Sequence, residues 1–114
     1  MLGVFKKDPT WVEAAQIASV AASQLGRHEI AIQLSYELAT RRPEDPVGHY
    51  NLACSLSMAG LVDVAADSMV SSILLGFRDL EALEVNSMLI NLLESDKFEA
   101  VEEVIEALAV KGEL

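Results

Sequence analysis

The sequence predicts an all-α protein built from paired helices, and three observations favour this fold class. Apolar residues make up 52% of the 114 residues but aromatic residues only 5%, so the core is expected to consist of Ala, Leu, Val and Ile in closely packed helices. The three prolines and most of the glycines lie between the apolar stretches, where they separate helices. The chain is also similar to itself when it is shifted by 34 residues.

Helix-start signals divide the chain into about six helices. Asp8 and Asp45 each precede a proline, which provides a capping side chain followed by a residue suited to the first helical position. Asp79 is expected to cap the fifth helix, and Asp96 to begin the sixth in a capping box with Glu99. The predicted helices span residues 9–24, 28–41, 46–59, 62–75, 79–94 and 96–110.

The 34-residue shift places turn glycines and small residues on one another. Gly26 falls on Gly60 and Ala31 falls on Ala65. Each glycine stands where one helix has to turn into the next, and Gly76 stands at a similar break. These glycines are expected to adopt the left-handed conformation that ends a helix. The pattern predicts helical hairpins of common length.

Residues 46–79 carry the resemblance to a known family. Tyr50-Asn51-Leu52-Ala53, Gly60 and Ala65 resemble the first helix, the turn glycine and the small residue of the tetratricopeptide repeat. The first repeat, residues 12–45, lacks the large residues expected in its first helix. Residues 80–110 are similar to the last repeat of bacterial members, which departs from the consensus sequence, and to the capping helix that follows it. The resemblance implies a single domain over 1–114, an α-solenoid of three hairpins in a right-handed superhelix. The alternative is a six-helix bundle.

In that family the first helix of each hairpin lines a concave groove. By this count the groove positions are Glu13, Gln16, Val20, Ser23 and Gln24, then Val47, Tyr50, Cys54, Ser57 and Met58, then Glu81, Glu84, Met88, Asn91 and Leu92. Tyr50 is expected to be the aromatic anchor, with the methionines as adaptable contacts. The predicted partner-binding set is Gln16, Val20, Tyr50, Cys54, Ser57, Met58, Glu84, Met88 and Asn91.

The resemblance also predicts the kind of partner. Some members hold an acidic C-terminal tail with a clamp of Lys, Arg and Asn, and here the clamp positions are Gln16, Val20, Asn51, Glu81 and Val85. Only Asn51 matches, so a neutral, apolar or basic protein segment is favoured. The leading interpretation is a non-catalytic protein–protein interaction module.

No residue pattern predicts an enzyme, a metal site or a cofactor. Cys54 has no nearby basic residue to lower its thiol pKa, and it is expected to be a small, semi-buried side chain. His49 and Cys54 are five residues apart, a spacing that does not bring two ligands onto one helical face. His49 is instead expected on the packing surface of the hairpin. No phosphate-binding loop or nucleophile motif is recognisable.

The acidic net charge of the chain disfavours one further class of partner, nucleic acids. The net charge is −10, and residues 58–114 hold 12 acidic and 3 basic side chains, which disfavours nucleic acid binding. This acidic half is either a solvated face or a surface for a basic partner. No apolar run reaches the length of a membrane span, and one cysteine is compatible with a reducing compartment, so we expect a cytoplasmic protein that does not bind membranes.

The first helix leaves little room for a polar face, because Trp11, Ile17, Val20 and Leu25 stand among many alanines. This face is expected to be a close helix contact within the monomer or a surface for self-association or a partner. Two alternative functions therefore remain. One is a self-assembling structural protein, a homo-oligomer through the first helix; the other is a dedicated chaperone of a secreted bacterial protein.

Overall fold

The fold is given by a computed structural model that describes residues 9–114, and all regular elements in this range are helices. The predicted all-α class is confirmed for this part of the chain. None of these helices has both the length and the apolar character needed to cross a membrane. The elements are α1 (Pro9–Gln24), α2 (His28–Arg41), α3 (Pro46–Met58), α4 (Val62–Leu74), α5 (Leu80–Val85), the 3₁₀-helix η2 (Ser87–Leu89), α6 (Ile90–Leu93) and α7 (Phe98–Val110).

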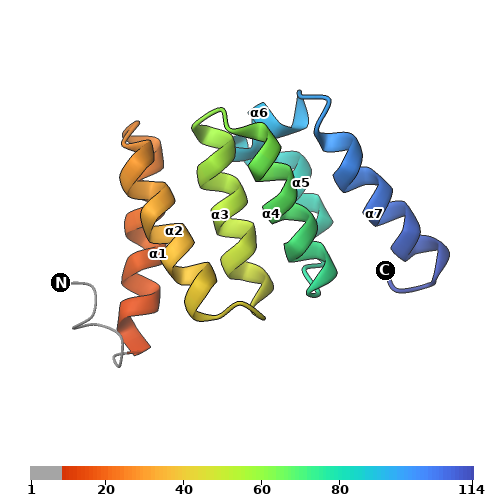
Figure 1. The fold of residues 1–114 in the computed structure, drawn as a ribbon, viewed down its shortest axis with the longest axis horizontal. Coiled ribbons are helices and arrows are strands. Elements are labelled where there is room, and N and C mark those ends of the chain that lie inside the picture. The colour runs from red at the N-terminus through yellow and green to blue at the C-terminus, as the bar shows by residue number, and fades with distance from the viewer. Residues whose placement is uncertain (1–8) are drawn as a thin grey trace.

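The helices stand side by side in a row (Figure 1). Consecutive helices α1 to α4 pack on one another in chain order, and α7 packs on α4. The result is elongated, with extents of 45 × 27 × 20 Å. Helix α3 contacts α1 and α2 on one side and α4, η2 and α6 on the other. Helix α3 therefore lies between the first two helices and the rest of the row.

Glycines form the turns within the hairpins as predicted. Gly26 and Gly60 have φ of 77° and 80°, in the left-handed region. At the first turn Arg27 N–H donates to the Ala22 carbonyl at 2.8 Å, and the equivalent bond at the second turn closes at 2.9 Å. This pattern is the Schellman motif, which satisfies the last carbonyls of a helix. The two hairpins α1–α2 and α3–α4 thus share one turn geometry.

The predicted caps are confirmed at two helices and wrong at one. The Asp45 carboxylate accepts a bond from Val47 N–H at 3.0 Å, and Asp79 accepts one from Ala82 N–H at 3.3 Å. Asp8 lies outside the described residues. Asp96 does not cap the last helix, because α7 begins two residues later than expected, after Lys97, and has no side-chain cap.

The predicted fifth helix, residues 79–94, is wrong as one continuous element. It is broken at Asn86, whose backbone is extended with φ of −75° and ψ of 111°. The Asn86 side chain accepts a bond from Met88 N–H at 3.0 Å and so caps a new helical segment. Asparagine competes in this way with the helical backbone. The chain changes direction there, and η2 and α6 fold against α3.

The core is aliphatic and follows the row of helices. Its largest fully buried side chains are Met69, Ile73, Leu89, Leu92 and Val101. Helix α7 has two different faces, since its apolar side packs on the core while its glutamates are exposed.

Three buried serines join the first three helices, and the sequence did not suggest this cluster. Ser19 of α1 lies 2.6 Å from Ser35 of α2, which lies 2.7 Å from Ser55 of α3 (all Oγ to Oγ). Each hydroxyl has a partner, which offsets the desolvation of its burial. The cluster fixes α1 relative to α3.

Removal of the Asn86 side chain tests the break in the fifth helix. Asn86→Ala loses the cap on η2 and a half-buried hydrogen bond to Tyr50, so we expect the free energy of unfolding to fall by about 2 kcal/mol. The measurement is urea unfolding followed by circular dichroism. The neighbouring variant Ser87→Ala, at an exposed position, should stay within about 0.5 kcal/mol of wild type. Equal stability of the two variants would contradict this role for Asn86.

Candidate functional site

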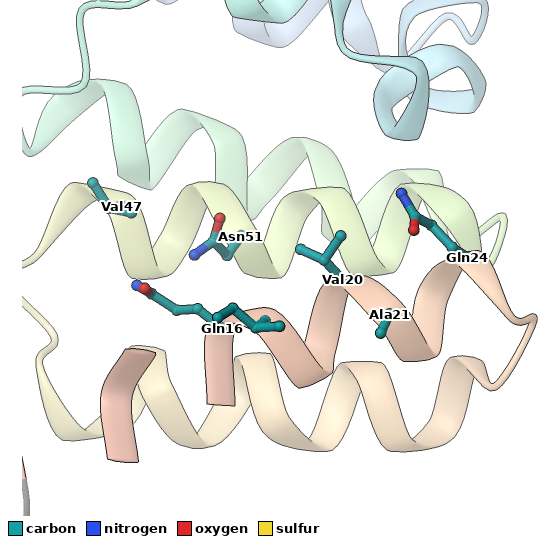
Figure 2. Close-up of a pocket in the computed structure, with 7 residues that line it drawn as sticks. Gln16, Val20, Ala21, Gln24, Val47 and Asn51 are labelled. Atoms are coloured by element: carbon teal, nitrogen blue, oxygen red, sulfur yellow. The ribbon is translucent and has the colours of Figure 1, made fainter. Parts of the chain in front are cut away.

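A groove between α1 and α3 brings two residues of the predicted partner-binding set together. Its volume is about 510 Å³. The side chains that line it come from one face of α1 and the adjacent face of α3 (Figure 2). They are Gln16, Ile17, Val20, Ala21, Gln24, Val47 and Asn51.

Helical spacing places the α1 side chains on one face. Gln16, Val20 and Gln24 are separated by four residues each, so they follow one another along the helix. Val47 and Asn51 have the same separation on α3. The serine cluster and the two hairpin turns hold these two faces next to each other. The groove is therefore set by packing behind it.

The chemistry of this groove is uncharged. Val20 and Val47 are 38% and 44% exposed and give it an accessible apolar floor. The amides of Gln16, Gln24 and Asn51 surround that floor (Figure 2). A primary amide both donates and accepts hydrogen bonds, as a peptide group does. Such a surface suits a polypeptide backbone with small apolar side chains.

The predicted site is only partly assembled here. Of the predicted partner-binding set, Gln16 and Val20 line this groove, and so do Gln24 and Val47, two other predicted groove positions. Ile17, Ala21 and Asn51 are not among the predicted groove positions. The signal that could have found Ile17 and Ala21 is their position one residue after Gln16 and Val20 on the same exposed face. Asn51 stands at a clamp position of the resembled family, outside the predicted partner-binding set.

Three residues of the predicted partner-binding set are buried, and the prediction that they face a ligand is wrong. Two further predicted groove positions, Ser23 and Leu92, are buried as well. Cys54, Ser57 and Met88 are 3%, 0% and 8% exposed. The cause is the break at Asn86, which folds η2 and α6 over this part of α3. Leu92 N–H donates to Ser57 Oγ at 3.1 Å, so a serine of α3 caps α6.

Two further predicted residues take part in the same internal contacts. Asn91 Nδ2 donates to the Ser57 carbonyl at 2.8 Å, and the half-buried Met58 packs against the core. Glu84 is exposed but lines a separate cleft with α7. None of the three lies in the groove between α1 and α3.

Tyr50, the predicted aromatic anchor, is an internal contact of the fold. Its ring stacks on Phe77 with centroids 4.4 Å apart and planes at 13°. Its hydroxyl accepts a hydrogen bond from Asn86 Nδ2 at 2.7 Å. Burial, partly offset by this bond, raises the pKa of Tyr50 to about 12. The ring therefore supports the turn at Asn86.

Cys54 and His49 are held in ways that disfavour chemistry. Burial raises the pKa of the Cys54 thiol to about 12, which suppresses the nucleophilic thiolate. Asn86 Nδ2 lies 3.6 Å from its sulfur. The Nε2 of His49 donates to the Pro43 carbonyl at 2.8 Å. Residues 9–114 bring no three His, Cys, Asp or Glu side chains together as a metal site.

Comparisons of the chain with models of known protein families, with curated proteins and with solved structures give no match.

The raised pKa of Cys54 predicts a loss of stability at alkaline pH. The folded thiol titrates at about 12 against an ordinary value of 9.0, so the unfolded chain loses this proton first. The contribution of the protonated Cys54 thiol to the free energy of unfolding is constant below pH 9 and falls as the pH rises from 9 to 12. At pH of about 10.5 the loss from this thiol is about 2 kcal/mol.

Urea unfolding at neutral pH and at pH of about 10.5 measures this loss, with Cys54→Ala as the matched control. We expect wild type to lose about 2 kcal/mol more than the variant, because Tyr50 and the lysines titrate in both proteins. Equal losses would show that Cys54 ionises freely in the folded state.

Proposed function

We propose that this protein is a non-catalytic adaptor of the tetratricopeptide-repeat type that binds an uncharged segment of a partner protein between α1 and α3. The single observation that carries the proposal is the groove itself, which combines exposed valines with three amides and has no ionisable side chain in its lining. Amides can pair with the backbone of a bound segment, and the valines can cover its small apolar side chains.

The repeat-type fold is part of this proposal. It is supported by two successive hairpins with the same glycine turn, 34 residues apart, and by the packing of α1 to α4 in chain order. In this interpretation the row of helices is an α-solenoid with a right-handed twist, and α7 closes its C-terminal end. The third hairpin departs from the repeat because its first helix is broken at Asn86.

The chemistry of the groove limits the type of protein segment that it can bind. An acidic tail would find no lysine or arginine in the lining, so a neutral or apolar segment is favoured. The raised pKa of Cys54 and the hydrogen bond that holds His49 support a binding protein over an enzyme. A single buried cysteine also suits a reducing compartment such as the cytoplasm.

Selection of peptides against the protein tests this function. Three random pools, neutral, acidic and basic, are displayed on phage, and we expect the neutral pool to give the groove ligands. Val20→Glu places a charge on the apolar floor and should lower the affinity for the selected peptides by about tenfold or more. Gln16→Ala/Asn51→Ala should weaken them by a smaller factor, about three- to tenfold.

The matched control is Gln33→Ala, at an exposed position of α2 outside the groove. It should leave the affinity unchanged. The proposal is wrong if the selected peptides bind Val20→Glu and wild type equally, or if the acidic pool gives peptides with the same dependence on Val20. Circular dichroism of each variant separates a lost contact from a lost fold.

Self-assembly is a second candidate, and exposed apolar side chains at the N-terminal end of the row favour it. Ile17, which lines the groove, is 68% exposed, and Leu25, directly after α1, is 73% exposed. The other exposed residues of α1 include several alanines. An apolar face of this kind is suited to a second copy of the chain. Static light scattering over a hundredfold range of concentration tests it: a rising mass that Ile17→Glu abolishes supports self-assembly, and a constant monomer mass removes it.

A further inference from the structure

A second cleft lies between α5 and α7, at the end of the row opposite α1 (Figure 1). Its volume is about 250 Å³, below the range of typical small-molecule pockets. Leu80, Leu83, Phe98 and Ile105 form its floor. None of the residues that line it belongs to the groove between α1 and α3.

The floor is part of the edge of the core. Leu83 is 2% exposed, and Leu80, Phe98 and Ile105 are half-buried against the main cluster of core residues. Helix α7 is also held near both ends. Lys97 Nζ pairs with Asp63 of α4 at 3.6 Å, and Arg78 Nε donates to the Glu113 carbonyl at 3.2 Å. The cleft is therefore preformed by the packing of α7.

The rim of the cleft is acidic on both sides. Glu84 of α5 faces Glu102 and Glu106 of α7 across it, and all three are exposed. Within residues 9–114 the two ion pairs are Arg41–Glu37 and Lys97–Asp63, so neither neutralises this rim. Residues 79–110 contain nine acidic side chains and one basic side chain, Lys97. An apolar floor is thus bordered by carboxylates whose charge the nearby chain does not balance.

We propose that the cleft between α5 and α7 binds an amphipathic basic segment of a partner protein, with a leucine-like side chain on the floor and an arginine on the rim. Arginine suits this surface because its aliphatic stem can cover apolar side chains while its guanidinium bonds carboxylates in pairs. The half-buried ring of Phe98 adds a face on which a guanidinium can stack. This surface is separate from the proposed groove between α1 and α3 and does not depend on it.

The test uses the whole chain and a fluorescent synthetic helix of about fifteen residues, with leucines on one face and arginines beside them. Two matched peptides replace the arginines by glutamates or the leucines by alanines. We expect the arginine–leucine peptide to bind wild type, with an affinity that falls as salt is added, and both matched peptides to bind more weakly. Glu102→Gln/Glu106→Gln should lower the affinity for the arginine–leucine peptide by about fivefold.

The control is Glu99→Gln/Glu103→Gln, which removes the same charge from the same helix. Those two glutamates line a different hollow, together with Asp63 and Asp67 of α4, so this variant should keep more than half of the wild-type affinity. Equal loss in the two variants would overturn the proposal, because the attraction would then come from net charge alone. Binding by the glutamate peptide would overturn it as well.

Two further measurements separate this surface from the other proposals. Val20→Glu should leave binding of the arginine–leucine peptide unchanged, so failure of the groove proposal does not affect this one. If Glu102→Gln/Glu106→Gln instead abolishes self-association seen by light scattering, the occupant is a second copy of the chain and the partner-protein proposal is wrong.

Discussion

The amide of Asn86 is the contact on which the packing of residues 86–93 against α3 depends. It donates to Tyr50 and accepts from Met88 N–H, so both ends of one side chain are used. The first bond ties α3 to a residue 36 positions later, and the second ends α5 and begins η2. This pair of bonds stabilises the break that divides residues 79–94 into separate helical segments.

One consequence is that α3 presents two different surfaces. Near its N-terminus, Val47 and Asn51 face a groove shared with α1. Further along, Cys54 and Ser57 are covered by η2 and α6. The chain itself thus covers this part of α3, and the open groove is shorter than the predicted row of groove positions. Its lining is also uncharged, whereas the acidic residues gather at the other end of the row.

Sequence reasoning succeeded where structure is local. The glycine turns at Gly26 and Gly60 and the caps at Asp45 and Asp79 depend on a few adjacent residues, and all four are confirmed. The break at Asn86 combines a local cap on Met88 N–H with a hydrogen bond to the hydroxyl of Tyr50, 36 positions earlier, and this distant contact cannot be recognised from the residues around Asn86. The burial of Cys54, Ser57 and Met88 follows from that break. The serine cluster was missed for the same reason, because it joins three helices.

The docking of η2 and α6 on α3 is the central claim, and native-state hydrogen exchange at the Leu92 amide measures it most directly. This N–H donates to Ser57 Oγ, a bond that exists only while α6 covers α3. We expect its opening free energy to approach that of global unfolding. Exchange as fast as in an unstructured peptide, while the amides of α3 and α4 stay protected, would show that the segment leaves α3 and that Cys54 and Ser57 belong to an open groove.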